Sequence, residues 1–187
     1  MLLKQKLQQS AKGIRHGADG VLLQRVEKSL PFALTHDQDG AWQDIRQDME
    51  RDLPMRRLVQ GDVGSGKTVI AMLALVKTVE NGCQGAMMAP TEILAEQHYE
   101  SFCRQLQPFG IRISFLSGRL TKKQREAVYQ EILRHETDIV IGTHALIQEE
   151  VHFHRLGLVV TDEQHRFGVA QRTAWRRKGI ASPMYSS

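Results

Sequence analysis

Short apolar runs alternate with longer helical patterns along most of the chain. The runs lie at Leu58–Val59, Ala86–Met88, Ile111–Leu116, Ile139–Ile141 and Leu158–Val160. Each run is apolar on both faces, as in strands that helices cover on both sides, and strands that alternate with helices usually pair in parallel. The pattern therefore predicts an α/β fold with a parallel sheet and helices on both faces.

The first thirty residues follow another pattern. Residues 2–12 and 21–29 have helical periodicity, and a break from Gly13 to Gly20 separates them. We expect residues 1–30 to form a helical linker. The remaining residues, 31–187, are expected to form one domain, because a chain of 187 residues that is 41% hydrophobic can bury a core without disulfides or metals.

Composition excludes several classes of protein. No apolar run approaches the roughly 20 residues that cross a bilayer, and Met1–Lys6 turns polar too early for a signal peptide. The two cysteines, Cys83 and Cys103, form no CxxC motif and have no nearby histidine set, which disfavours a disulfide scaffold and a zinc ribbon. We expect a cytoplasmic protein without a membrane partner.

Charge is uneven along the chain, although the net value is only +4. Residues 1–30 carry six bases and two acids, residues 31–165 carry fourteen and nineteen, and residues 166–187 carry five bases and no acid. A basic surplus of this size is compatible with nucleic-acid binding and equally with solvated helical faces, so it does not decide between them.

One motif indicates phosphate binding. The segment GDVGSGKT matches G-x-x-x-x-G-K-[ST], with an apolar stretch before it and an apolar helical pattern, Thr68–Glu80, after it. Glycines let successive backbone N–H groups face a phosphate at the start of a helix. A dinucleotide fingerprint fits less well, because its third glycine position holds Val69. The expected nucleotide-binding residues are Gly61, Asp62, Val63, Gly64, Ser65, Gly66, Lys67 and Thr68.

Two acidic residues follow the last apolar run. A nucleoside triphosphatase with this loop needs a carboxylate on the metal side, and Asp162 supplies one that can hold Mg²⁺ together with the hydroxyl of Thr68. Glu163 can orient and deprotonate the attacking water. The competing interpretation is a plain surface turn, and no metal other than the Mg²⁺ of ATP is expected.

The residues Asp162-Glu163-Gln164-His165 resemble the DEQH box of superfamily 2 helicases. The resemblance implies a RecA-like P-loop fold and a role for Gln164 and His165 in coupling the nucleotide state to the grip on nucleic acid. The catalytic residues it implies are Lys67, Asp162, Glu163, Gln164 and His165.

Three further segments resemble motifs of that superfamily. Leu30–Gln38 resembles the motif that reads adenine, which implies nucleotide contacts for Phe32 and Gln38. Met88–His98 resembles motif Ia and Ile141–Ala145 resembles motif Ib. Both lie at strand ends, where hydroxyl and N–H groups can hold strand phosphates without reading bases. The DNA-binding residues implied are Pro90, Thr91, Glu92, Gly142, Thr143 and His144.

Within superfamily 2, Gly61–Thr68 together with Asp162–Val169 is similar to the branch-migrating DNA helicases, and the resemblance covers the chain from about Leu30 to Gly179. This resemblance implies the first motor lobe of an ATP-dependent double-stranded DNA helicase that acts in repair and recombination, on stalled forks and Holliday junctions, in the bacterial cytoplasm at the nucleoid. The implied partners are branched DNA, a second RecA-like lobe and a wedge domain, with the whole protein a monomer.

Two alternatives stay open: the equivalent lobe of a transcription-repair coupling translocase, and a truncated module that binds without turnover. A small-molecule kinase is more distant. The chain stops before motif III, so we expect feeble hydrolysis by this chain alone.

Three other features are expected to have structural roles only. His152-x-His154 is expected to be surface polar residues, Trp42 to pack in the core, and Arg176–Lys178 to be a solvated helix end. For Arg166, Phe167 and Gly168, with Gln171 and Arg172, sensing of DNA or ATP and a scaffold role are equally compatible with the sequence.

Overall fold

The computed structural model describes residue 17 and residues 20–51, 67–162, 169–179 and 184–186. Four predictions fall on residues outside these ranges: the helix at 2–12, the strand at 58–59, the phosphate loop from residue 61 to 66, and residues 163–168, which include Glu163, Gln164 and His165.

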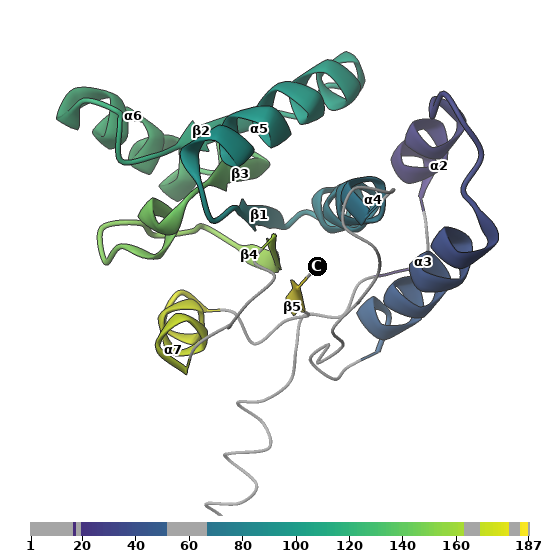
Figure 1. The fold of residues 1–187 in the computed structure, drawn as a ribbon. Coiled ribbons are helices and arrows are strands. Elements are labelled where there is room, and N and C mark those ends of the chain that lie inside the picture. The colour runs from purple at the N-terminus through teal and green to yellow at the C-terminus, as the bar shows by residue number, and fades with distance from the viewer. Residues whose placement is uncertain (1–16, 18–19, 52–66, 163–168, 180–183, 187) are drawn as a thin grey trace, which may run out of the picture.

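Five parallel strands form the sheet of the described residues, in the order β2-β3-β1-β4-β5 (Figure 1). Four of them contain or overlap a predicted apolar run. Because all four pairings are parallel, each connection has to cross back to the start of the next strand, and the predicted parallel α/β fold is confirmed. The strands are β1 (Gln84–Met88), β2 (Ile113–Leu116), β3 (Ile139–Gly142), β4 (Leu156–Thr161) and β5 (Met184–Ser186).

Threonines begin three of the helices. Thr35, Thr91 and Thr121 each accept a hydrogen bond from the backbone N–H three residues later, which satisfies a donor that the helix itself leaves unpaired. The helices are α2 (Val21–Lys28), α3 (His36–Met49), α4 (Lys67–Glu80), α5 (Glu92–Leu106), α6 (Lys122–Leu133) and α7 (Val169–Arg177), with short 3₁₀ turns η1 (Gln107–Phe109) and η2 (His144–Ile147). None of the helices within the described ranges is long and apolar enough to cross a membrane.

The two faces of the sheet carry separate hydrophobic clusters. On one face Met87 of β1 packs with residues of α4 and with Phe102 of α5. On the other face Ala86 and Met88 of the same strand pack with Ile132 of α6 and with η2 and α7. Successive residues of a strand point to opposite faces, so both faces of β1 are covered, as the apolar runs predicted.

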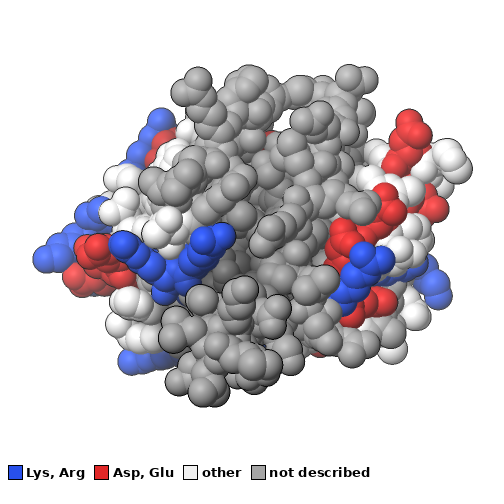
Figure 2. Space-filling view, turned by 90° about the horizontal axis from the view of Figure 1, so that it is seen from below, with Lys and Arg blue, Asp and Glu red and all other residues white. Residues whose placement is uncertain are grey.

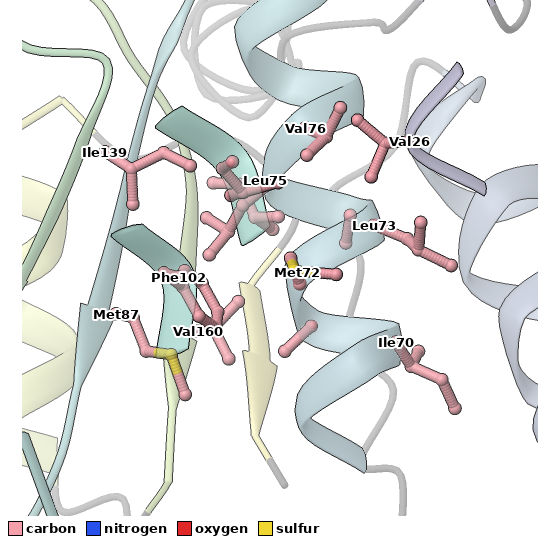
Figure 3. Packing of buried hydrophobic residues seen from close by; sticks show 14 of the residues in the cluster. Val26, Ile70, Met72, Leu73, Leu75, Val76, Met87, Phe102, Ile139 and Val160 are labelled. Carbon is pink, nitrogen blue, oxygen red and sulfur yellow. The ribbon is translucent and has the colours of Figure 1, made fainter. Parts of the chain in front are cut away.

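Helix α4 lies in the middle of the larger cluster. Its residues from Ile70 to Val76 are at most 2% exposed. Figure 3 shows Leu75 on the side of the sheet, near Phe102, and Val76 on the opposite side, beside Val26 of α2. The helix that follows the phosphate loop is therefore fixed by packing on both sides.

Helix α2, which the sequence assigns to a linker, packs against α4. Its residues Leu23 and Val26 are at most 1% exposed and belong to the same cluster as the sheet. The carboxylate of Glu80 accepts hydrogen bonds from the N–H groups of Leu22 (2.9 Å) and Leu23 (3.1 Å), at the start of α2. The boundary at residue 30 stays a prediction, but α2 shares the hydrophobic core of the sheet.

Candidate functional site

The carboxyl ends of four neighbouring strands form one edge of the sheet. Backbone hydrogen bonds hold the residues after these strands side by side: Ala89 N–H donates to the carbonyl of Gly142 (2.8 Å), and Asp162 N–H donates to the carbonyl of Met88 (2.8 Å). Ligands of open parallel sheets bind at this edge. The segments that resemble motifs Ia and Ib and the first acid of the acidic pair are thus brought together.

Of the residues that the structure describes, Asp162 and Thr68 are the two that the sequence analysis expects to bind Mg²⁺. Asp162 follows β4 directly, and its side chain is 29% exposed. Thr68 is half-buried in the first turn of α4. Carboxylate and hydroxyl oxygens are the hard donors that Mg²⁺ takes from proteins, so the donor set fits the ion. Lys67 is the first residue of α4.

A histidine that the sequence analysis did not single out contacts Asp162. The Nε2 of His98, on α5, lies 2.7 Å from Oδ2 of Asp162. His98 stands three residues after Ala95 and four before Phe102, both buried, so it lies on the stripe of α5 that faces the core. A polar residue among the buried positions of this stripe was the sequence feature that could have indicated a polar partner for His98.

The start of α5 presents part of motif Ia. Pro90 and Thr91 are exposed. The Thr91 hydroxyl oxygen accepts from Leu94 N–H (3.2 Å), which leaves its proton free to donate to a phosphate. Glu92 is half-buried, and its Oε1 accepts from Gly118 N–H (3.3 Å), so it ties the loop after β2 to α5. This loop, which the sequence analysis did not mark, lies at the same edge.

The residues of motif Ib differ in their exposure. Gly142 and Thr143 are buried, whereas His144 is exposed. A Cβ atom built on Gly142 would lie 2.1 Å from the carbonyl oxygen of Leu116, on the neighbouring strand. Position 142 therefore requires glycine, because β2 and β3 approach too closely there to leave room for a side chain. A DNA contact of Gly142 stays a prediction.

We expect Gly142→Ala to destabilise the lobe by about 3 kcal/mol or more, because the added methyl group collides with backbone that has no room to move. The control is Gly40→Ala: this helical glycine has open space around its Cβ position, and the change should stabilise by about 0.5–1 kcal/mol. Urea unfolding measures both variants. Equal stability of the wild type and Gly142→Ala would contradict the close approach.

The segment that resembles the adenine motif lies between α2 and α3. Gln38 and Thr35 form a reciprocal cap of α3: Thr35 N–H donates to Gln38 Oε1 (2.9 Å), and Gln38 N–H donates to Thr35 Oγ1 (3.2 Å). Phe32 is 51% exposed and lines a hollow of about 470 Å³, together with Leu34 and Trp42. Gln38 is not among the residues that line this hollow. Nucleotide contacts of Phe32 and Gln38 stay predictions.

Charged side chains are distributed unevenly on the face shown in Figure 2. Described Lys and Arg side chains are more frequent on the left and acidic side chains on the right, with some of the opposite charge on each side. In the basic group at the end of α7, Arg176 and Arg177 are exposed, but Lys178 Nζ donates to the carbonyls of Val151 (2.8 Å) and Gln148. Burial lowers the pKa of Lys178, whose role here is to tie α7 to the loop after η2.

The other residues considered from the sequence have structural contacts. The Trp42 side chain is 1% exposed and its Nε1–H donates to Glu27 (3.0 Å), which confirms the expected packing. Cys83 is buried, and this burial raises the pKa of its thiol. The ring of His154 lies 5.4 Å from that of His135. Within the described ranges, no group of three or more His, Cys, Asp or Glu side chains is placed to hold a metal ion.

Comparison with known proteins gives one family and a consistent set of relatives. The family model described as DEAD/DEAH box helicase matches residues 35–183. Two relatives are the ATP-dependent DNA helicase RecG of Aquifex aeolicus, 45% identical over 179 residues, and that of Haemophilus influenzae, 52% identical over 164 residues. These matches cover 96% and 88% of this chain but 23% and 24% of the relatives, so the chain spans about a quarter of their length.

Solved structures agree with these relatives. A structure of RecG bound to a three-way DNA junction matches with a TM-score of 0.83 and 43% identity, over 99% of this chain and 25% of that one. The UvsW helicase of bacteriophage T4 matches with a TM-score of 0.66 and 15% identity, over 92% of this chain and 61% of that one, and shows the fold alone.

Proposed function

This chain belongs to the DEAD/DEAH box helicase family, and we propose that it is the ATP-binding motor lobe of an ATP-dependent DNA helicase of the RecG type. The observation that carries the proposal is the shared sheet edge, at which Asp162 contacts His98 of α5, the helix whose start is exposed at the same edge. This arrangement supports the proposal, because the carboxylate proposed for the nucleotide and the helix start proposed for strand phosphates belong to the same packed sheet edge.

In this proposal ATP binds where α4 begins. Backbone N–H groups of residues 61–66 and the ammonium group of Lys67 hold its phosphates, while Thr68 and Asp162 hold Mg²⁺. Bound Mg²⁺ neutralises charge on the phosphates. Glu163 orients the attacking water and accepts its proton, and Gln164 and His165 link this site to the strand. The ring of Phe32 offers an apolar surface for the base.

The DNA strand lies along the same edge. The exposed Thr91 hydroxyl and the N-terminus of α5 offer donors to phosphate oxygens, and the exposed His144 lies after the next strand. Such contacts hold the backbone of a strand without reading its bases. We propose branched DNA, at stalled replication forks and recombination junctions, as the substrate of the whole protein, because the RecG that shares 43% identity was solved on a three-way DNA junction.

A second RecA-like lobe and a wedge domain complete the proposed protein, which acts as a monomer on chromosomal DNA in the bacterial cytoplasm. Relatives named RecG, 45–53% identical, favour this assignment over the transcription-repair coupling translocase and over an inactive module. They also disfavour a small-molecule kinase.

The binding of a three-way junction by the 187-residue chain tests the DNA part of this proposal. Fluorescence anisotropy should give similar affinities for two junctions of unrelated sequence. If about three phosphates are contacted, raising the salt from about 50 to about 200 mM should weaken binding roughly 40-fold. Lys67→Ala should leave this binding unchanged, since Lys67 serves the nucleotide. An affinity that depends on base sequence, or binding that is insensitive to salt, would contradict the proposal.

A further inference from the structure

A direct contact joins helix α5 to the carboxylate that we assign to magnesium. The Nε2 of His98 lies 2.7 Å from Oδ2 of Asp162, and the two side chains are 12% and 29% exposed. A carboxylate accepts hydrogen bonds, so the Nε2–H of His98 is the donor. A ring that is mostly buried and donates to one oxygen fixes the direction in which the carboxylate points.

The position of His98 along α5 relates this contact to the start of the helix. Thr91, the N-cap, and His98 are seven residues apart, which in an α-helix means two turns, one face and about 10 Å along the axis. One face of one helix therefore carries a hydroxyl that we assign to a strand phosphate at its start and the donor to Asp162 farther along.

The helix holds His98 firmly. Ala95, Phe102 and Leu106 are fully buried along the same side of α5, and the ring of Tyr99 lies 5.4 Å from that of Phe115 on β2. A displacement of the helix start therefore moves the His98 ring with it, because packed helices shift as units rather than by local bending.

We propose that His98 is a positioning residue that orients Asp162 toward the Mg²⁺ of bound ATP and makes this orientation respond to a strand held at the start of α5. The inference rests on the proposed function of the same site. Partners that hydrogen-bond to a ligating carboxylate set the affinity of a metal site, and their loss commonly costs 10- to 100-fold. The contact gives the strand a physical route to the nucleotide site.

The test is a magnesium titration of the 187-residue chain with a fluorescent ATP analogue. His98→Leu removes the donor and places an apolar side chain of similar size on the buried stripe. His98→Gln places an amide N–H near the position of the imidazole Nε2–H. The control is Gln97→Ala, an exposed neighbour on the same helix. Thermal unfolding of every variant reports the fold.

His98→Leu should raise the Mg²⁺ concentration at half-saturation about tenfold, without changing nucleotide binding in the absence of Mg²⁺. His98→Gln should recover most of this loss, and Gln97→Ala should behave as the wild type. A single-stranded oligonucleotide should lower the Mg²⁺ midpoint of the wild type and of His98→Gln, but not that of His98→Leu.

Two results would overturn the role of His98 without affecting the proposed function. One is an unchanged Mg²⁺ midpoint in His98→Leu, whether or not its unfolding temperature falls. The other is a loss of Mg²⁺ affinity in His98→Gln equal to that in His98→Leu. Absence of any Mg²⁺-dependent nucleotide binding by the wild type would overturn the proposed function itself, and the inference with it.

Discussion

Lys67→Ala should weaken the binding of Mg-ATP about 100-fold, the largest loss of binding expected of a single change in this chain. Lys67 ends the segment that matches the phosphate-loop motif and begins α4, and in the proposed function its ammonium group supplies a positive charge to the phosphates. A hydrogen bond to a charged group contributes about 1.5–3 kcal/mol, and about 3 kcal/mol corresponds to roughly 100-fold in affinity. Calorimetric titration of the 187-residue chain measures the change.

Lys123→Ala is the matched control, because Lys123 is exposed on α6 and should leave the affinity for ATP unchanged. Lys77 is unsuitable: its side chain is 1% exposed, and Nζ donates to Gly17 (2.7 Å) and to Glu50 (3.1 Å), so its loss would disturb the fold. Equal affinities of the wild type and Lys67→Ala would remove the assignment of the phosphate loop.

Glu163→Gln should separate binding from turnover. The amide keeps the size of the side chain but cannot take a proton from water, so Mg-ATP should bind with unchanged affinity while hydrolysis falls by about 10²- to 10⁴-fold. The rate is measured under single-turnover conditions, with the chain placed in a two-lobed protein. Glu163 follows Asp162 directly, so the affinity for Mg²⁺-ATP is measured on the same samples.

Glu126→Gln is the control for this change, since Glu126 is exposed on α6. It should leave both affinity and rate as they are. Hydrolysis by Glu163→Gln at the rate of the wild type would show that another residue accepts the proton, and the role given to the second acid would then be wrong.

Four strands of the sheet could be predicted because each contains or overlaps an apolar run, whereas β5 (Met184–Ser186) matches no such run and was not predicted. The strand expected at Ile111–Leu116 begins later, at Ile113. Gly110 adopts a positive φ of 79°, and Arg112 N–H donates to the carboxylate of Asp138 (2.8 Å) instead of to a neighbouring strand, so the strand does not begin before Ile113. Asp138 lies 26 residues from Arg112 in the sequence, so no local sequence pattern predicts this hydrogen bond.

Long-range polar contacts are the part of the site that the sequence does not reveal. His98 was quoted as the end of motif Ia, but its partner, Asp162, is 64 residues away. The docking of α2 likewise depends on Glu80, 58 residues from Leu22. Gln84 is fully buried because its amide donates to two carbonyls and accepts from two N–H groups of distant loops. The hydrophobic periodicity and the secondary-structure propensities of the sequence do not indicate such long-range pairs.

One short sequence pattern can have both a structural and a functional role, and the sequence alone does not separate the two. Thr35-x-x-Gln38 is a capping box at the start of α3 and is also part of the segment that resembles the adenine motif. The structure shows the first use, through two hydrogen bonds between these residues. The second use requires bound nucleotide, so a contact between Gln38 and adenine stays a prediction.

The measurement that tests the central claim most directly is ATP turnover with and without a three-way DNA junction. It is made on the 187-residue chain alone, and on the same chain in place of the matching segment of the Thermotoga maritima RecG, to which it is 51% identical over 167 residues. Arginines from another domain contribute roughly 10³- to 10⁵-fold in related phosphate-loop enzymes, so we predict feeble turnover by the chain alone. In the hybrid the junction should stimulate turnover, and Lys67→Ala should abolish it. A folded hybrid that binds Mg-ATP and the junction, yet shows no turnover that depends on the junction, would contradict the account.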